Sequence, residues 1–366
     1  MKNQSILILG GSFDPPHSYH LKVLKYAIKK IKPSKIIIFV TYQSPLKEKH
    51  FVSYIHRKKM TKILTKKANI KCSFDDFEFK RKKKTYTYQI KRYLKEKYPS
   101  HTLYFLMGSD SFKNIEKWKR YKEILKTFKI VIAQRKGYSI EKNKIKKYKL
   151  IILDKKFDNI SSTLLRKKIL TLDFSSIDKD IKNYIIKNKL YFTDIILTVK
   201  KTISKKRFKH TISVIKIATD LAEKYNLDLK KVFFAALLHD IAKELPLEKQ
   251  IRLIKKEKIK IKKFNNVIKK APQILHQWSS AVYAKKIFKI KDKEILSAIS
   301  KHTTGDKKMK LIDKIIYVSD FISDDREFRE ARIIRKIAFK DIELAFKKTK
   351  ELKSMYVIKN KEYLYE

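Results

Sequence analysis

Short apolar runs alternate with lysine-rich segments of helical spacing through the first half of the chain. Such runs are typical of strands that are buried on both faces of a parallel sheet. The segments between them are expected to be crossover helices that cover the sheet. The pattern therefore predicts an α/β layered domain whose strands lie at residues 6–9, 35–40, 102–108, 129–134 and 149–153.

The pattern changes near residue 195. From there the apolar residues follow helical spacing, as in HTISVIKIATDLAEKY and KKVFFAALLHDIAKEL, and no further strand is expected. The predicted fold class is therefore α/β plus all-α. A parallel-sheet domain covers residues 1–192, and an all-helical domain covers residues 193–366.

Basic residues dominate the composition, with 91 Lys and Arg against 37 Asp and Glu and a formal net charge of +54. Such a charge attracts polyanions, so an RNA-binding platform is one alternative function. However, lysine outnumbers arginine by roughly six to one and is spread along the whole chain, as codon bias in an AT-rich genome produces. We therefore expect no specific nucleic-acid partner.

Cysteine content and apolar run length bear on the compartment. The single cysteine, Cys72, excludes an internal disulfide and any CxxC motif. No apolar run approaches the ~20 residues that span a bilayer, and the N-terminal run is too short for a signal peptide. The sequence predicts a cytoplasmic protein without a membrane partner, and it leaves the oligomeric state open.

The stretch GGSFDPPHSYH, residues 10–20, directly follows the first predicted strand. Glycines at this point let the backbone turn and approach a ligand, and the next helix offers its N–H groups to an anion. His17 and His20 lie on one face of the first helical turn, where they can donate hydrogen bonds to phosphate oxygens. A turn with incidental histidines is the alternative, and zinc is disfavoured because no soft ligands lie nearby.

This stretch resembles the nucleotidyltransferase signature G-x-F-D-P-x-H-x-G-H, and NISSTLLRKKI (159–169) resembles its partner motif I-S-S-T-x-I-R. Further motifs narrow the resemblance, over about residues 1–192, to nicotinate-nucleotide adenylyltransferases: SPLK (44–47), RKKM (57–60), FEFKRKKKTYTYQI (77–90) and LMGSDSF (106–112). The resemblance implies a Rossmann-like sheet. It also implies transfer of AMP from ATP to nicotinate mononucleotide with Mg²⁺, which yields deamido-NAD and pyrophosphate.

The same resemblance assigns residue roles. His17, His20 and Arg166 are expected to be catalytic, and Trp118 to stack on the pyridine ring. The residues expected to bind ATP or the mononucleotide are Gly10, Gly11, Ser12, Phe13, Lys47, Tyr86, Thr87, Gly108, Asp110, Trp118, Ser162 and Thr163.

Three positions depart from the family pattern. Tyr19 replaces a glycine, so its side chain must point away from the phosphates. Leu46 stands where histidine is common, and the usual R-P-G loop reads Arg135-Lys136-Gly137. These departures bear on the affinity for nucleotides.

The helical half carries polar residues in apolar surroundings. His239 and Asp240 lie in FFAALLHDIAKEL, and Asp320 lies in IIYVSDFI. Burying charge is costly unless it is paired or bound to metal. A single histidine in such a helix is usually a satisfied core residue, but this half contains four: His210, His239, His276 and His302. Imidazole together with carboxylate suits Fe, Mn and similar divalent ions.

The series His210…His239-Asp240…Asp320 resembles the H…HD…D signature of the HD phosphohydrolase superfamily, and His276 and His302 suggest a second metal ion. Over about residues 195–345 the chain resembles bacterial HD proteins that hydrolyse diadenosine tetraphosphate symmetrically into two ADP. In that resemblance a hydroxide that bridges two metal ions attacks an inner phosphorus, and Asp240 is catalytic as well as a ligand.

Two cations, Lys243 and Arg326, are candidate contacts for the polyphosphate in this resemblance. One departure is Asp306, which stands where the family often has arginine. The leading hypothesis is a bifunctional enzyme that acts on ATP, nicotinate mononucleotide and diadenosine tetraphosphate. The alternative is an active adenylyltransferase whose HD domain hydrolyses another nucleotide phosphate or senses a nucleotide.

Overall fold

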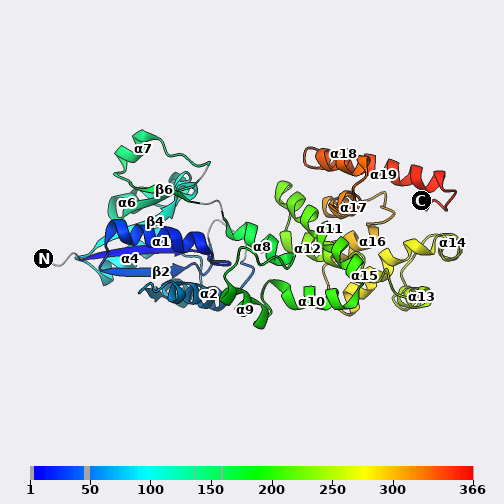
Figure 1. Cartoon of the computed structure of the whole chain (residues 1–366), viewed down its shortest axis with the longest axis horizontal. Coiled ribbons are helices and arrows are strands. Elements are labelled where there is room, and N and C mark those ends of the chain that lie inside the picture. The colour runs from blue at the N-terminus through cyan, green and yellow to red at the C-terminus, as the bar shows by residue number, and fades with distance from the viewer. Residues whose placement is uncertain (1–3, 45–49, 136, 158–159, 366) are drawn as a thin grey trace. The chain divides into compact units, whose positions relative to one another are not determined.

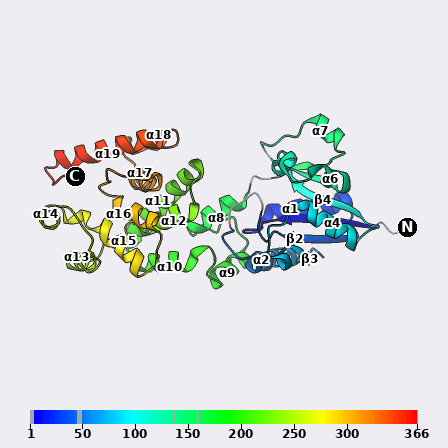
Figure 2. The ribbon, with the colours of Figure 1, turned by 180° about the vertical axis from the view of Figure 1, so that it is seen from behind.

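The computed structural model describes residues 4–44, 50–135, 137–157 and 160–365. The chain divides into two compact units, one of Met1–Ile169 with Asp173–Tyr191 and the other of Leu170–Leu172 with Phe192–Glu366. Figure 1 shows strands in the first unit and helices in both, and Figure 2 shows the same elements from behind.

The first unit is built on a parallel sheet with the strand order β3-β2-β1-β4-β5-β6. Its strands are β1 (Ser5–Gly11), β2 (Lys35–Val40), β3 (Ser73–Asp75), β4 (Thr102–Gly108), β5 (Lys129–Arg135) and β6 (Ile151–Phe157). The five predicted strands are confirmed, although the last begins at Ile151 instead of residue 149. β3 was not predicted because its three residues, SFD, form no apolar run.

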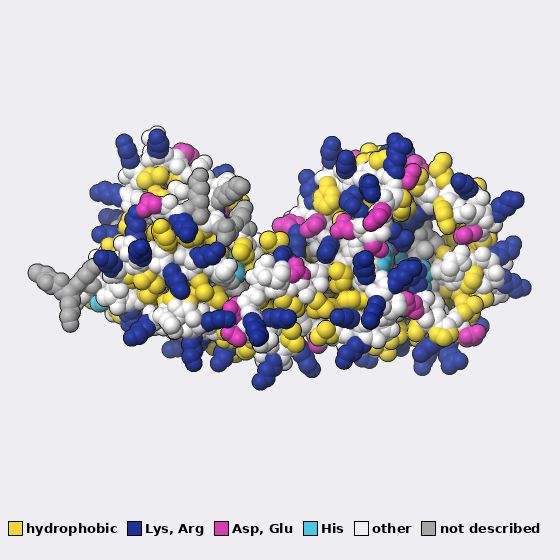
Figure 3. Space-filling model, in the orientation of Figure 1, with side chains coloured by type: hydrophobic (Ala, Val, Ile, Leu, Met, Phe, Trp, Pro, Cys, Tyr) yellow, Lys and Arg dark blue, Asp and Glu magenta, His cyan; other side chains and the backbone are white. Residues whose placement is uncertain are grey.

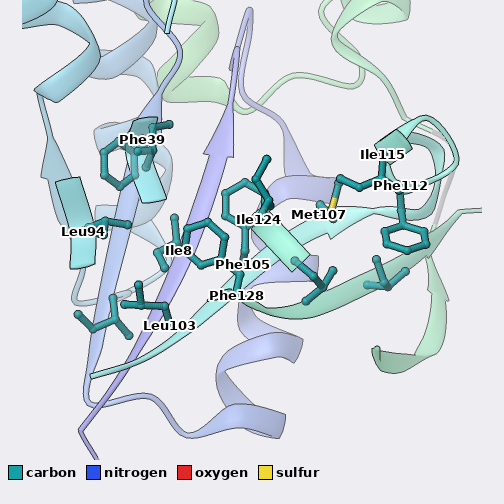
Figure 4. Packing of buried hydrophobic residues seen from close by; sticks show 14 of the residues in the cluster. Ile8, Phe39, Leu94, Leu103, Phe105, Met107, Phe112, Ile115, Ile124 and Phe128 are labelled. Atoms are coloured by element: carbon teal, nitrogen blue, oxygen red, sulfur yellow. The ribbon is translucent and has the colours of Figure 1, made fainter. Parts of the chain in front are cut away.

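The sheet is buried on both faces, which explains why its strands are continuously apolar. In β1, Ile6 and Ile8 pack into one core cluster, and Leu7 and Leu9 pack into another on the opposite face. Figure 4 shows the first cluster, in which Ile8 lies among aromatic residues such as Phe105. These two cores hold the strand ends, and therefore the loops that follow them, in fixed positions.

Helices cover both faces of the sheet. α4 and α6 contribute to the cluster around Ile8, whereas α1 contributes to the opposite cluster. The helical elements of this part of the chain are α1 (Ser18–Ile31), α2 (Tyr54–Lys67), α3 (Phe77–Arg81), α4 (Thr87–Lys97), α5 (Ser109–Phe112), η1 (Ile115–Lys117), α6 (Tyr121–Thr127), α7 (Lys142–Lys147), α8 (Ser162–Leu170), α9 (Lys179–Lys187) and η2 (Leu190–Phe192).

The strand order reverses between β1 and β4, which lie side by side at the centre of the sheet. In open α/β sheets, ligands bind at the carboxyl ends of the strands at such a switch point. Here those ends are Gly11 and Gly108. The topology therefore brings the motif at residues 10–20 next to the motif at residues 106–112.

The second unit is helical, and no strand occurs among its described residues. α11 packs against α12 and α17, and α16 packs against α12, α15 and α17. The helical elements are α10 (Thr193–Thr202), α11 (Lys205–Lys224), α12 (Leu229–Leu238), α13 (Leu247–Lys256), α14 (Phe264–Lys270), η3 (Pro272–Ile274), α15 (His276–Lys286), α16 (Lys293–Lys301), α17 (Leu311–Ile322), α18 (Arg329–Ala338) and α19 (Ile342–Lys359). Among the described residues, no helix is both long enough and apolar enough to cross a membrane.

Candidate active sites

The turn after β1 differs from the sequence expectation in one respect. Gly10 and Gly11 are the last residues of the strand, and the residue with a left-handed backbone is Phe13, with φ 49°. A Cβ atom at Gly11 would lie 3.0 Å from the Phe13 ring. The glycine therefore makes room for that ring, while the sharp change of direction occurs at Phe13.

His17 and His20 meet at the start of α1. The backbone N–H of His17 donates to Nδ1 of His20 over 3.2 Å, and the two ring centroids are 3.9 Å apart. Because Nδ1 of His20 accepts this bond, the proton of its neutral ring lies on Nε2. His17 is buried, and burial together with the Arg135 charge lowers its pKa to about 3. His17 is therefore neutral at physiological pH.

The partner motif at the start of α8 binds the same turn. Arg166 donates from Nη1 to the carbonyl oxygen of Asp14 over 2.8 Å, and Ser162 Oγ donates to that of Pro15 over 2.9 Å. A second nitrogen of Arg166, Nη2, lies 3.1 Å from Thr163 Oγ1. Ser161 caps the helix by accepting from the N–H of Leu164, as a serine at this position does. Two motifs separated by about 150 residues therefore form one cluster.

An acidic residue, Asp110, follows the end of β4. Gly108 lies so close to Asp110 that a Cβ atom would overlap the Asp110 carboxylate. Arg135 donates to this carboxylate over 2.9 Å and lies 4.4 Å from the centroid of the Tyr19 ring. Tyr19 is buried. Its large side chain is therefore accommodated under Arg135, where the usual residue is a glycine.

Only some of the other residues that are expected to bind nucleotides in this unit lie near one another. Tyr86 precedes Thr87 at the start of α4, and Lys119, next to Trp118, lies 5.4 Å from the Tyr86 ring centroid. Trp118 is half-buried and packs against the core cluster around Ile8. The carbonyl oxygen of Ser12 accepts from Arg57 Nη1 over 2.6 Å. Lys47 and Leu46 lie outside the described residues.

In the second unit, the packing of the helices brings six ligand-type residues together. His210 lies in α11 and Asp320 in α17, while His239, Asp240, His276 and His302 lie at or next to helix ends. Two groups have donor atoms that all lie within 4.8 Å of one another. They are His210, His239 and Asp320, and His239, Asp240 and His302.

The predicted sixth residue, His276, joins the second group through Asp240. His276 Nε2 lies 3.2 Å from Asp240 Oδ1, and His302 Nε2 lies 3.3 Å from the same oxygen. In the first group, His210 Nε2 lies 3.0 Å from Asp320 Oδ1. The fold therefore gathers all six residues that the sequence predicted as metal ligands.

The orientation of the histidines suits metal binding. Nδ1 of His239, His276 and His302 lies 2.6–2.7 Å from a backbone carbonyl oxygen three residues earlier. Each Nδ1 therefore carries the proton, and each Nε2 presents a lone pair to the acidic centre. His239 Nε2 and Asp240 Oδ1 are buried without a hydrogen-bond partner among the described residues. Buried atoms that offer lone pairs and have no hydrogen-bond partner are suited to bind a divalent metal ion.

The charges of His239 and Asp240 match this arrangement, whereas Asp320 and Asp325 outweigh burial and raise the pKa of His210. Burial lowers the pKa of His239 to about 4, so its ring is neutral. Burial alone would raise the pKa of Asp240, but contacts with neighbouring side chains hold it well below its usual range. Neutral imidazoles and ionised carboxylates are the protonation states that bind metal.

Two further residues complete the cluster, and the sequence analysis missed both. Asp325 accepts from His210 Nδ1 over 2.9 Å, and it directly precedes Arg326 in the sequence. Arg207, one turn before His210 in α11, donates to Asp240 Oδ2 over 2.7 Å. The spacing of Arg207 from His210 was a usable signal, since residues three apart share a helix face.

Of the two predicted phosphate contacts, Lys243 lies at this cluster. Lys243 Nζ lies 3.2 Å from Asp240 Oδ2. Arg326 is exposed. Asp306 accepts from the N–H of Lys308 and lies 4.0 Å from Lys301 Nζ, so neighbouring groups compensate its charge. Figure 3 shows histidine side chains in a hollow of the helical unit, whereas lysines and arginines are scattered over the visible face.

Comparisons with known proteins agree with the two-part architecture. The Cytidylyltransferase-like family model matches residues 8–168, and the HD domain model, which implies divalent metal binding, matches residues 207–325. A protein of Mycoplasma genitalium named "Probable nicotinate-nucleotide adenylyltransferase/Ap4A hydrolase" is 34% identical over 88% of this chain and 89% of its own length. A Mycoplasma pneumoniae protein with the same name is 28% identical over 94% of this chain and 97% of its own length.

One solved structure is also similar to the helical part. It is a Clostridium acetobutylicum protein described as a "predicted HD superfamily hydrolase involved in NAD metabolism". It is 34% identical, with a TM-score of 0.45, over 48% of this chain and 90% of that chain.

Proposed function

Because the chain belongs to the nicotinate-nucleotide adenylyltransferase/Ap4A hydrolase family, we propose that it catalyses one reaction in each unit, in the cytoplasm. The first unit transfers AMP from ATP to nicotinate mononucleotide. The second unit hydrolyses diadenosine tetraphosphate symmetrically into two ADP. The observation that supports the proposal is that two distant motifs meet at one turn in the first unit, and that ligand-type residues lie close together in the second.

The transfer needs positioning more than acid–base chemistry. The phosphate of nicotinate mononucleotide is already ionised near pH 7, so it attacks the α-phosphorus of ATP without a base. A new O–P bond forms, and the bond from that phosphorus to pyrophosphate breaks. Mg²⁺ bound with ATP neutralises charge on the leaving pyrophosphate.

The chain supplies hydrogen-bond donors for that charge. The protonated Nε2 of His20 and the guanidinium of Arg166 belong to one cluster, which the bond from Arg166 to Asp14 ties together. Donors fixed in advance stabilise charge that develops in the transition state. We assign Gly108, Asp110 and Trp118 to the nucleotides, because they follow β4 at the switch point of the sheet.

The transferase proposal is tested by pyrophosphate release from ATP in the presence of nicotinate mononucleotide. We expect release with this substrate, formation of deamido-NAD, and loss of both in His20→Ala. Release without deamido-NAD would contradict the assigned acceptor.

The hydrolase proposal rests on the converging imidazoles and carboxylates of the second unit. Two divalent ions held by the six predicted ligands supply Lewis-acid activation of water and charge neutralisation. The donor set favours Fe²⁺ or Mn²⁺. Water attacks an inner phosphorus and the central P–O–P bridge breaks, so that two ADP form and the two protons of the water are released as their new terminal phosphates ionise. Lys243 and Arg326 bind the polyphosphate.

Metal content tests this half independently of turnover. We expect about two ions per chain after loading with Mn²⁺, and a lower content in His239→Ala, because this residue belongs to both ligand groups. A chain that binds no divalent ion would contradict the proposed site.

A further inference from the structure

Lys353 lies in the C-terminal helix α19, outside residues 207–325, which match the HD domain. Its ammonium nonetheless reaches the metal cluster. Nζ donates to the backbone carbonyl of His302 over 3.2 Å and lies 3.8 Å from Asp320 Oδ2. It also lies 3.9 Å from the centroid of the Tyr317 ring. One side chain from the end of the chain therefore contacts one residue of each ligand group.

The two oxygens of Asp320 face different partners. Oδ1 lies 3.0 Å from His210 Nε2 and 3.9 Å from His239 Nε2, whereas Oδ2 faces Lys353. An ammonium 3.8 Å from Oδ2 attracts this oxygen and so favours the rotation of the carboxylate that presents Oδ1 to the histidines. The same ammonium holds the carbonyl of His302, which follows the last turn of α16.

From this geometry we propose that Lys353 is a positioning residue for the two metal ions, through Asp320 on one side and His302 on the other. The proposal rests on the proposed hydrolase function of the HD domain. Lys353 is not part of the H…HD…D motif, and it lies in α19, which carries none of the six predicted ligands. Groups that orient metal ligands typically change metal affinity by 10–100-fold when they are removed.

The segment beyond Lys353 packs near the same ligands. Tyr365 packs against Trp278 with ring centroids 5.4 Å apart, and Glu362 lies within 3.4 Å of the Gln273 side chain. The carbonyl oxygen of Gln273 is the group that binds Nδ1 of His276. Contacts beyond Lys353 thus fix the end of α19 beside a third ligand of the cluster, and this placement supports a positional role for the helix.

Two roles of Lys353 make opposite predictions for metal affinity. A cation close to a ligand repels a metal ion, so a purely electrostatic role predicts tighter metal binding when the charge is removed. A positioning role predicts weaker binding, because Asp320 and His302 lose their orientation. The direction of the change therefore decides between the two roles without any measurement of activity.

The experiment uses the full chain and Mn²⁺ as the probe, with bound and free ion measured by electron paramagnetic resonance. The variants are Lys353→Met, Lys353→Arg and Lys353→Gln. Lys350→Met is the matched control, since Lys350 is exposed on the same helix. Circular dichroism of the metal-free proteins shows whether each variant folds, and Lys353→Gln keeps a donor without the charge if the methionine variant does not fold.

We expect Lys353→Met to weaken at least one Mn²⁺ site by 10–100-fold, Lys353→Arg to restore much of the affinity, and Lys350→Met to bind as the wild type does. Unchanged or tighter binding in a folded Lys353→Met protein would overturn the proposal and leave the metal site intact. If the wild type bound no Mn²⁺, this result would refute the metal site itself and therefore also the proposed role of Lys353.

Discussion

At the scale of the residue, each imidazole of the metal cluster is oriented by one hydrogen bond at Nδ1. Three of these bonds go to backbone carbonyls within the same helix or turn. His210 differs, because its partner is the Asp325 carboxylate, 115 residues away. The orientation of His210 can be tested by substituting Asp325, whereas a backbone carbonyl cannot be removed by a substitution.

We predict that Asp325→Ala weakens Mn²⁺ binding by 10–100-fold, because His210 loses the acceptor that orients it. Isothermal titration of the metal-free protein measures the change. Asp324→Ala is the control, since Asp324 lies next in the chain and pairs with Arg335 instead. Equal affinities in both variants would show that Asp325 does not orient His210.

His20→Ala should reduce kcat/KM for pyrophosphate release by roughly 10²–10³-fold, the usual cost of removing one donor to developing charge. The measurement is a coupled assay with ATP and nicotinate mononucleotide. His101→Ala serves as the control, because His101 directly precedes β4, whereas the proposed site lies at the other end of that strand. A similar loss in both variants would indicate a general defect in folding.

Glu78 provides a pH-dependent test of burial. It accepts from the N–H of Tyr42, and burial raises its pKa to about 7, partly offset by that bond and by Arg57. Because the folded-state pKa exceeds the unfolded value, the group favours folding below pH ~4.5, and this contribution is lost as the pH rises through about 7. The ionised carboxylate then costs ~3 kcal/mol.

Glu78→Gln should therefore be more stable than the wild type at pH 8 and of similar stability at pH 5. Urea unfolding at both pH values measures the difference. The same stability difference at pH 5 and pH 8 would mean that Glu78 ionises normally in the folded protein.

At the scale of the element, three of the histidines in the metal cluster lie at the end or the start of a helix. α12 begins at the Asp228 cap, which accepts from the N–H groups of Lys230 and Lys231, and it ends at His239. Fixing the start of a short helix also fixes the position of its last residue. The stability of α12 is therefore coupled to the placement of a ligand that both metal groups share.

We predict that Asp228→Ala destabilises the second unit by ~1 kcal/mol, the usual value of such a cap, whereas Asp228→Asn keeps the acceptor and costs little. Urea unfolding followed by circular dichroism measures both variants. If alanine and asparagine had the same effect, the cap would contribute nothing and the charge alone would matter.

Much of the fold could be predicted at this scale, because buried parallel strands and amphipathic helices each leave a pattern in the sequence. β3 could not, since three residues show no periodicity. The motifs also identified the six metal-type ligands that the fold gathers. Asp325 and Lys353 were not predicted as site residues, because their contacts join helices far apart in the chain and local spacing carries no trace of them.

At the scale of the whole molecule, each of the two compact units contains one cluster of predicted site residues. The charge of +54 belongs to the chain as a whole, and Figure 3 shows its cations dispersed over the visible face of both units. Because neither cluster draws a residue from the other unit, the two reactions are expected to be separable.

We predict that His239→Ala abolishes hydrolysis but retains at least half of the rate of AMP transfer, and that His20→Ala does the reverse. Parallel assays on the two variants measure this. Loss of both reactions in either folded variant would contradict two independent sites.

The most direct test of the bifunctional account is product analysis by chromatography. The full chain is loaded with Mn²⁺ or, without oxygen, with Fe²⁺, and is incubated with diadenosine tetraphosphate beside His239→Ala. The account predicts ADP as the sole product from the wild type and no product from the variant. AMP with ATP would contradict symmetrical cleavage, and no product from a chain with bound metal and active AMP transfer would contradict the hydrolase assignment.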